Sequence, residues 1–461
     1  MPNRNALPRT RSALHLESQH IAIKHNRRGH IEDLQQRRHP SYFNCHVIPL
    51  LDGYDIAPST GYAKMNSRMV KRRAITITLT LTVATVAALS LHSTHVRARE
   101  IPQVGLLRTP HGGIQPQTVL DRDGALHMIY FKGDASAGDI EYVRRAADGK
   151  HFSQPIRVNS EPESAVAIGT VRGPQIALGR DGRVYVIWFG SRERSGNASD
   201  ALPVCFSRLN NSGKAFEPQR NLMQYAKGGD GGLSIAADTL GDVYAVWHAM
   251  GAQPGEGHRR VYLARSADDG KTFAREVPIS PPPLGACGCC GMRAFADERG
   301  TLFILYRAAA ESVHRDMTLL ISTDQGVTFH DTTVGPWELN ACPMSTAYLS
   351  EGGKRVLAAW ETAGQVYFDS VEPVSLKVTA PIAAPGEGDN RKHPAVAANV
   401  NGQVLMVWTE GTGWSKGGSV AWQLLDNTGK PMSAEGHAAG VPVWGLPSAF
   451  ADRKGNFTII Y

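Results

Sequence analysis

The chain has 461 residues, including 47 glycines and 27 prolines, and its apolar runs are short, which favours many short strands over long amphipathic helices. Its formal charge is +7. The first 98 residues contain 14 Lys and Arg and 5 Asp and Glu, a charge of +9, whereas the remainder contains 35 Lys and Arg and 37 Asp and Glu, a charge of −2. A nucleic-acid-binding surface needs a basic face on the folded body, so we expect no nucleic-acid partner.

Residues 1–64 are rich in His and Arg without hydrophobic periodicity, and we predict either a disordered segment or an over-extended N-terminus. Residues 65–98 are typical of a secretory signal peptide. Lys71, Arg72 and Arg73 precede an uncharged stretch over residues 74–91, and a small-x-small cleavage site ends at Ala98. An uncleaved membrane anchor is the alternative, because the stretch is near the minimum length for spanning. We therefore expect a periplasmic or secreted protein that meets a membrane only through an uncleaved leader.

Residues 99–461 are predicted to form one domain built on a repeat. A polar turn ending in Gly is followed about six residues later by an aromatic residue that closes a β-branched run, and copies recur every fifty to sixty residues or so, the length of a four-stranded blade. The run-closing aromatics are Tyr130, Trp188, Trp247, Tyr306, Trp360, Trp408 and Tyr461.

A lone four-stranded sheet cannot bury both of its faces, whereas blades stacked around an axis can. The fold class is therefore all-β: a β-propeller of four-stranded antiparallel blades whose repeated aromatics pack between blades. We expect seven blades, with six as the alternative. The last copy has only two strands, and a strand at residues 101–106 is predicted to close that last blade.

Two turns share the pattern Ser-x-Asp-x-Gly-x-Thr-aromatic, at residues 266–273 and 322–329, and three weaker copies occur elsewhere. In such an Asp-box, the Asp accepts backbone N–H groups, the Gly supplies a positive φ and the aromatic packs beneath the turn. The pattern indicates architecture and not catalysis.

Over residues 101–461 these features resemble the bacterial neuraminidase repeat family, the sialidase-like propellers. The resemblance implies an exo-α-sialidase-type glycoside hydrolase as one function, with three arginines for the substrate carboxylate, a Tyr–Glu nucleophile pair and an Asp acid/base. The first arginine of that family lies in an Arg-Ile-Pro motif, and the matching position here begins with Gly113, so that arginine is missing. Arg172 and Arg293 begin inner strands of other blades and could point into the channel.

A Cys-Gly-Cys-Cys segment supplies Cys287, Cys289 and Cys290, and Cys342 lies in a later Cys-Pro pair. Both segments precede inner strands of consecutive blades, so they should be neighbours on one rim. Here the chain also resembles uncharacterised exported propellers that have a Cys-x-Cys-Cys segment, a later Cys-Pro and an intervening Arg-Asp pair, a likeness that brings no established activity.

Three interpretations of these cysteines compete. In an oxidising compartment they form two disulfides, with three pairings open. They could instead bind Cu or Zn as thiolates, with Met292, Met344 or His314 as extra donors, although no cofactor is required by the sequence. The third interpretation is a redox-active disulfide between Cys289 and Cys290. Cys205 lies within a strand and is predicted to be a buried free thiol.

Long polar loops between second and third strands should share the cysteine-bearing rim. The candidate catalytic residues are Arg172, Arg293, Arg307, Arg315 and Asp316, and the candidate ligand-binding residues are His393, Trp337 and Glu311. Asp316 and Glu311 could form the carboxylate pair of a glycosidase. We expect an exported sialidase-like propeller that binds a ligand, a glycan or a metal, at this rim, with catalysis left open. A sialidase-type hydrolase and a protein-interaction scaffold are the alternatives.

Overall fold

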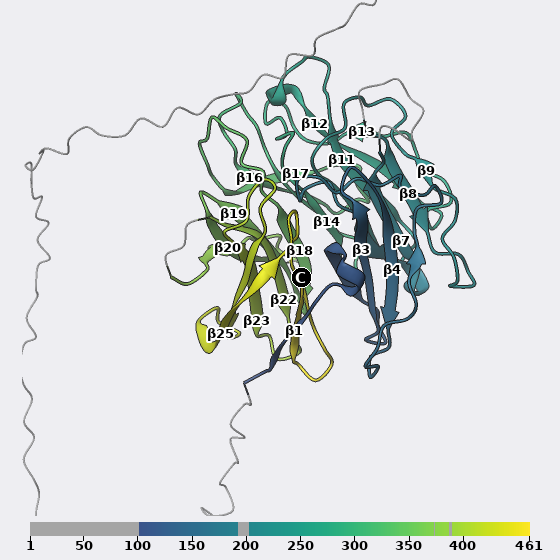
Figure 1. Ribbon diagram of the computed structural model, residues 1–461. Coiled ribbons are helices and arrows are strands. Elements are labelled where there is room, and N and C mark those ends of the chain that lie inside the picture. The colour runs from purple at the N-terminus through teal and green to yellow at the C-terminus, as the bar shows by residue number, and fades with distance from the viewer. Residues whose placement is uncertain (1–100, 192–201, 373, 387–389) are drawn as a thin grey trace, which may run out of the picture. The chain divides into compact units, whose positions relative to one another are not determined.

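The computed structural model describes residues 101–461 apart from residues 192–201, 373 and 387–389 (Figure 1). The predictions for the leader lie outside the described residues. Among the residues that are described, no helix has the length and apolar character needed to cross a bilayer. The only helical elements in these ranges are three single turns of 3₁₀-helix: η1 (Pro110–Gly112), η2 (Arg180–Gly182) and η3 (Glu256–His258).

The domain consists of seven sheets, which we number as blades in chain order (Figure 1). Blade one contains β2 (Ile114–Leu120), β3 (Leu126–Asp134), β4 (Ala137–Arg145) and β5 (Ile156–Arg157). Blade two contains β6 (Gln175–Leu178), β7 (Val184–Phe189), β8 (Val204–Arg208) and β9 (Arg220–Asn221). Blade three contains β10 (Leu233–Ala237), β11 (Val243–Ala249), β12 (Arg260–Ser266) and β13 (Val277–Pro278).

The next three blades repeat the same antiparallel order. Blade four contains β14 (Arg293–Ala296), β15 (Leu302–Arg307), β16 (Met317–Ser322) and β17 (His330–Gly335). Blade five contains β18 (Ala347–Gly352), β19 (Arg355–Thr362), β20 (Gln365–Val371) and β21 (Ile382–Ala383). Blade six contains β22 (Arg391–Ala398), β23 (Val404–Glu410), β24 (Gly418–Leu425) and β25 (Pro431–Val441).

Blade seven closes the ring with strands from both ends of the domain. It pairs β26 (Ser448–Ala451) with β27 (Phe457–Ile460), and β1 (Val104–Leu107) lies on the other side of β27. This confirms seven blades and the predicted closure by an N-terminal strand. The blade has three described strands, and β1 runs parallel to β27, with Val104 opposite Phe457. Hairpin neighbours must be antiparallel, but no hairpin joins β1 to β27, so the parallel direction is open to it.

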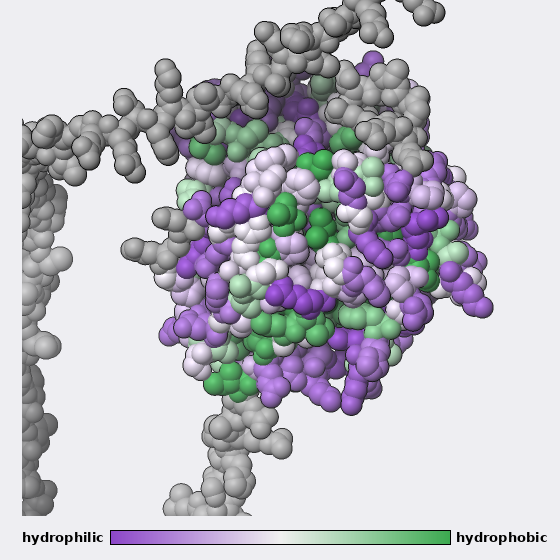
Figure 2. Space-filling view, in the orientation of Figure 1, coloured by the Kyte–Doolittle hydropathy of each residue, from purple (hydrophilic) through white to green (hydrophobic). Residues whose placement is uncertain are grey.

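The innermost strands of adjacent blades contact one another all the way round, from β2 through β6, β10, β14, β18, β22 and β26 back to β2. The run-closing aromatics pack between the blades, as predicted. Trp247 of blade three lies in one apolar cluster with Phe206 of blade two, and Trp360 of blade five lies in another with Phe303 of blade four. On the face shown in Figure 2, hydrophilic residues cover most of the periphery and hydrophobic residues form smaller patches, as expected when the sheet faces are buried between blades.

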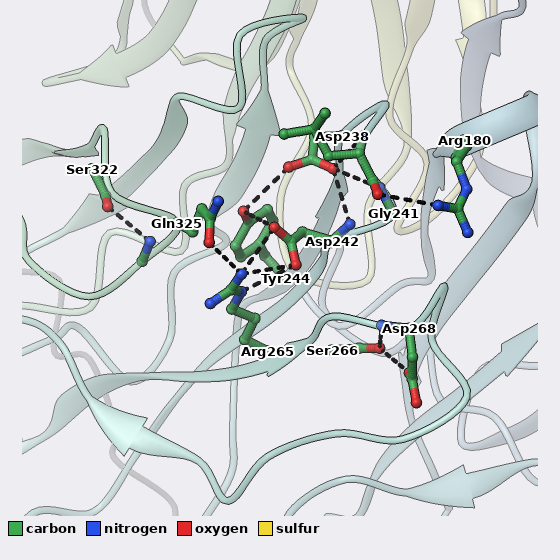
Figure 3. A network of polar contacts seen from close by, with 12 residues as sticks. Arg180, Asp238, Gly241, Asp242, Tyr244, Arg265, Ser266, Asp268, Ser322 and Gln325 are labelled. Atoms are coloured by element: carbon green, nitrogen blue, oxygen red, sulfur yellow. Dashed lines mark hydrogen bonds and ion pairs between the residues drawn. The ribbon is translucent and has the colours of Figure 1, made fainter.

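Polar contacts at the turns add further links between blades (Figure 3). Asp268 accepts hydrogen bonds from the backbone N–H and the hydroxyl of Thr272, at 2.8 and 2.7 Å, and from Ser266 Oγ at 2.7 Å. In blade three, Arg265 Nη2 donates to Asp242 at 3.0 Å and reaches Gln325 Oε1 of the blade-four turn at 2.5 Å. The Asp268 bonds thus hold one turn in shape, and the Arg265–Gln325 contact ties blade three to the turn of blade four.

Candidate functional site

The cysteine segment, residues 287–290, lies between β13 and β14, and Cys342 lies between β17 and β18. The two therefore precede the inner strands of blades four and five. Ligand atoms of Glu256, Cys289 and Cys342 all lie within 4.8 Å of one another. The prediction that the two segments meet on one rim is confirmed.

Three sulfur atoms converge in what we call the cysteine cluster: Cys287, Cys289 and Cys290. Cys287 Sγ lies 3.2 Å from Cys290 Sγ and 3.5 Å from Cys289 Sγ. Cys287 and Cys290 are buried, Cys289 is half-buried and Cys342 is exposed. The 3.2 Å separation joins two residues in Cys-x-x-Cys spacing. All four are free thiols in the structure.

Backbone hydrogen bonds to blades four and five hold the cysteine segment in place. Cys287 N–H donates to Arg307 O at 2.9 Å, and Gly291 N–H donates to Ser345 O at 2.9 Å. The segment also lies close against Gly231, where φ is +67° and a Cβ would stand 2.4 Å from Gly288 O. Only glycine fits that position without displacing the cysteine segment.

Arg307 is the central support of the site. It is 1% exposed, and its Nε donates to Ser345 Oγ at 3.1 Å while Nη1 donates to Arg315 O at 2.6 Å. Its Nη2 donates to Glu361 O, and the guanidinium lies 4.9 Å from the ring centre of Trp337. Ser345 Oγ in turn lies 3.8 Å from Cys290 Sγ. The buried cation is thus fixed next to Cys290, one of the two buried cysteines of the cluster.

A second arginine connects the cluster to the loop between β11 and β12. Arg315 Nη2 lies 2.7 Å from Glu256 Oε2, and Glu256 Oε1 accepts the Gly288 N–H at 2.9 Å. Arg315 Nη1 is buried and has no hydrogen-bond partner among the described residues. The cysteine cluster consequently has a carboxylate on its outer side and a buried guanidinium nitrogen that is available for an additional acceptor.

The surroundings separate the acidities of the three thiols. Burial acts to raise the pKa of Cys290, but hydrogen bonds from Cys287 and Cys289 and the charge of Arg307 lower it well below its ordinary value. Hydrogen bonds within the cluster and burial raise the pKa of Cys289. For Cys287, the hydrogen bond with Cys289 acts to lower the pKa, while the bond to Cys290 and burial raise it above the ordinary value. The surroundings of Cys290, with two thiol donors and a guanidinium, therefore lower the pKa of its thiol, whereas the pKa values of Cys287 and Cys289 are raised.

Of the predicted catalytic arginines, Arg307 and Arg315 meet at the cluster and the other two do not. Arg172 binds Asp230 Oδ1 through Nε and Nη2, at 2.9 and 2.6 Å. Arg293 spans the centre of the ring, where Nη1 donates to Gln117 and Gln175 and the guanidinium lies 4.7 Å from the ring centre of Tyr348. The four arginines therefore do not converge on one point.

The space beside Arg293 is small. The cavity between the innermost ends of the blades, lined among others by Gln175, Arg293 and Tyr348, has a volume of about 20 Å³. That is room for about one water molecule. The described channel therefore offers no sugar-sized chamber at this point.

The remaining predicted residues have local partners. Asp316 Oδ1 accepts the Trp337 N–H at 2.8 Å, so its carboxylate anchors the loop whose ring stacks on Arg307. The Glu311 side chain is 82% exposed, and its Oε2 lies 3.9 Å from His314 Nε2. Glu311 and Asp316 therefore contact different groups. His393 is buried with Nδ1 3.3 Å from Thr346 Oγ1, and burial together with the charge of Lys392 lowers its pKa to about 3.

Several supporting residues were not predicted as site residues: Glu256, Ser345 and Glu361. Glu361 is 1% exposed, its Oε1 accepts the Gly364 N–H at 2.9 Å, and burial raises the pKa of its carboxyl group. A sequence signal for it exists, since it directly follows Trp360, just as Arg307 follows Tyr306. Of the extra metal donors predicted, Met292 packs in an apolar core cluster and His314 faces Glu311 and Glu338, while Met344 as a donor stays a prediction.

The fold and this rim define the molecule as a seven-bladed β-propeller with a cysteine cluster at one end. No family model matches the sequence, and no curated protein matches it. Among solved structures, a protein of unknown function from Dyadobacter fermentans is 14% identical with a TM-score of 0.48, covering 68% of this chain and 94% of its own.

Two proteins with named activities are also similar. A Hadza microbial sialidase is 14% identical with a TM-score of 0.45, covering 69% of each chain. The polysaccharide lyase Uly1 is 13% identical with a TM-score of 0.43, covering 68% of this chain and 78% of its own. The likeness is one of fold, and no residue role is transferred from it.

Proposed function

We propose that this protein is an exported propeller that binds a thiophilic metal ion, Cu(I) or Zn(II), through its cysteine cluster. The observation that carries the proposal is the convergence of three sulfur atoms, with Cys287 3.2 Å from Cys290 and 3.5 Å from Cys289. Thiolates bound to one Zn(II) at about 2.3 Å lie about 3.8 Å from one another in a tetrahedron. Small side-chain shifts would therefore suffice to place the three sulfurs around one ion.

The chemistry of the donors selects the metal class. Sulfur-only sets favour Cu(I) and Zn(II) over hard cations such as Mg²⁺. Cu(I) can be held by three thiolates alone, whereas Zn(II) requires a fourth ligand. For Zn(II) that fourth ligand could be Glu256, which has a carboxylate oxygen within 4.8 Å of Cys289 Sγ.

The charges around the cluster also suit a metal–thiolate complex. Three thiolates and a monovalent or divalent ion leave a net negative charge. The guanidinium of Arg307, fixed beside Cys290 through Ser345, can offset part of that charge. Arg315, whose Nη2 pairs with Glu256, offers a further donor at Nη1, which has no hydrogen-bond partner among the residues that the structure describes. A buried positive environment of this kind favours the deprotonated ligands that metal binding needs.

The test uses residues 99–461 purified under reducing conditions and stripped of metal with a chelator. The reduced protein is expected to bind one tightly held equivalent of Cu(I) or Zn(II), measured by elemental analysis and by competition with a chromophoric chelator. Cys290→Ser should weaken that binding by about tenfold or more. Cys205→Ser is the matched control, because Cys205 is a buried free thiol in β8 outside the cluster. A reduced wild-type domain that retains no metal would refute the proposal.

Export bears directly on this site, because an oxidising compartment favours disulfides. Of the three pairings, the geometry is most compatible with Cys287–Cys290 together with Cys289–Cys342, given the sulfur separation of 3.2 Å in the first pair and the proximity in the second. Thiol titration and peptide mapping of protein recovered from its native compartment distinguish the disulfide form from a metal-loaded thiol form.

Hydrolysis of a sialoside is the alternative raised by the family resemblance, and the site gives it less support. A carboxylate clamp needs convergent guanidinium forks. Here Arg172 binds Asp230, Arg293 binds Gln117 and Gln175, and Arg307 binds oxygen atoms of the protein itself. Turnover of a fluorogenic sialoside by the folded domain would reverse this ranking.

A further inference from the structure

Two groups of metal-binding atoms share one residue at this rim. Cys287, Cys289 and Cys290 form one group, and Glu256, Cys289 and Cys342 form the other; within each group the ligand atoms all lie within 4.8 Å of one another. Cys289 is common to both groups. The side chains of the first group are mostly buried, whereas Cys342 in the second is exposed.

We propose that Glu256, Cys289 and Cys342 form an outer metal site that takes up Cu(I) from solution and passes it through Cys289 to the buried Cys287–Cys290 pair. This inference rests on the proposed function and goes beyond it by assigning a second site and a direction of uptake. The gradient of exposure supplies the direction, because solvent reaches Cys342 freely while Cys287 and Cys290 are 1% and 2% exposed.

The transfer is a sequence of ligand exchanges without change of oxidation state. At the outer site, Cys289 and Cys342 each lose a proton to solvent as they bind the ion, and Glu256 binds as the carboxylate. Cys290 and then Cys287 replace Glu256 and Cys342 on the ion, each binding as the thiolate and releasing its thiol proton to solvent. Cys342 regains a proton when it leaves. Cys289 remains bound throughout, so the ion is never without a protein ligand.

The contacts of Glu256 suit a temporary ligand. Its carboxylate already has two partners, Arg315 Nη2 at 2.7 Å and the Gly288 N–H at 2.9 Å. These contacts hold the carboxylate beside the cysteine segment before an ion arrives. They also give it a stable position to return to when the ion moves inward, which lowers the cost of its leaving the metal.

The experiment follows Cu(I) transfer from its bicinchoninate complex to reduced, metal-free domain by the loss of the complex's colour. Cys342→Ala is expected to slow the transfer by about tenfold while the amount of Cu(I) held at the end by the inner site stays unchanged. Cys342→His, which restores a donor, should recover most of the rate. Cys205→Ala should transfer at the wild-type rate. Thermal unfolding of each variant verifies the fold, and the exposed position of Cys342 predicts little change in stability.

The outcomes separate the two proposals. If wild type takes no Cu(I), the proposed function fails. If wild type binds Cu(I) and Cys342→Ala loads at the same rate, the uptake site is overturned and the proposed function stands. If Cys342→Ala abolishes binding at equilibrium, Cys342 belongs to the final site and the two-site scheme is also overturned. A slow variant with a full end-point, rescued by Cys342→His, supports the scheme.

Discussion

Replacing Arg307 by methionine tests the central support of the rim. Methionine keeps an unbranched apolar stem to about the position of Nε, but it lacks the guanidinium that lies over Trp337 and donates no hydrogen bonds. The substitution would leave Ser345 Oγ, Arg315 O and Glu361 O without the donors they now have. Arg307 is 1% exposed, so water cannot readily replace those donors.

The expected loss of folding stability combines one contribution that lowers it with two that partly compensate. Hydrogen bonds that involve a charged group stabilise a fold by about 1.5–3 kcal/mol each, so three contribute roughly 5–9 kcal/mol. Removing the guanidinium also removes the cost of burying its charge, which is several kcal/mol. Methionine recovers part of the apolar packing. We therefore expect Arg307→Met to lower the free energy of unfolding by about 3 kcal/mol.

The assay is urea unfolding of the reduced, metal-free domain at pH 7, followed by tryptophan fluorescence. Arg307→Lys should fall between wild type and Arg307→Met, because lysine keeps the charge but cannot present the planar fork that reaches three acceptors. Arg265→Met is a control of similar chemistry on a partly exposed arginine between blades. A loss below about 0.5 kcal/mol for Arg307→Met, the range of ordinary surface substitutions, would refute the assignment of Arg307 as the support of the site.

Three further outcomes are expected. The fold lowers the pKa of His393 from 6.5 to about 3, so between these pH values the unfolded chain binds one more proton than the folded chain, and stability decreases as the pH falls. His393→Gln should remove up to about 1.4 kcal/mol per pH unit of this dependence. Urea unfolding from pH 7 to pH 4 measures the effect. Asp268→Asn should cost about 1 kcal/mol at pH 7 through weaker bonds to Thr272, and equal stability at that pH would contradict the role of the turn. Deleting residues 99–108 removes β1 and exposes the edge of β27. Thermal unfolding should then begin at a lower temperature, and gel filtration should show self-association. A monomer with the wild-type melting temperature would argue against closure by β1.

The fold could be predicted because its determinants are local and repeated. Each run-closing aromatic, such as Trp247 or Trp360, ends the same kind of strand at the same distance from a turn, and one packing solution serves all copies. Closure by residues 101–106 followed from counting strands in the last copy. The parallel direction of β1 was not predicted, since no turn sequence specifies it.

The site could be predicted only in its location. The order of strands placed Cys289 and Cys342 at one rim, but the partner of each arginine depends on loop conformations that the repeat does not encode. Arg172 and Arg293 both lie at or just before the start of inner strands, yet one binds an aspartate and the other two glutamines. Glu256 was missed because nothing in a loop sequence shows that its carboxylate meets Gly288 and Arg315.

The position that follows each run-closing aromatic explains why the site lies on one side of the ring. In blades one and two this position holds Phe131 and Phe189, both fully buried. In blades three, four and five it holds His248, Arg307 and Glu361, each 1% exposed.

Burying a histidine, an arginine and a glutamate where phenylalanine fits elsewhere in the same fold lowers stability unless each finds polar partners. The partners found are Gly232 N–H for His248, Ser345 for Arg307 and Gly364 N–H for Glu361. The ring itself does not need these polar groups, because blades one and two close without them. Blade six holds Thr409 at this position, and its hydroxyl donates to Lys392 O at 3.1 Å, so a buried polar residue there does not by itself mark the site. The titratable side chains at this position, His248, Arg307 and Glu361, lie in blades three, four and five, and this grouping distinguishes these blades from blades one, two and six.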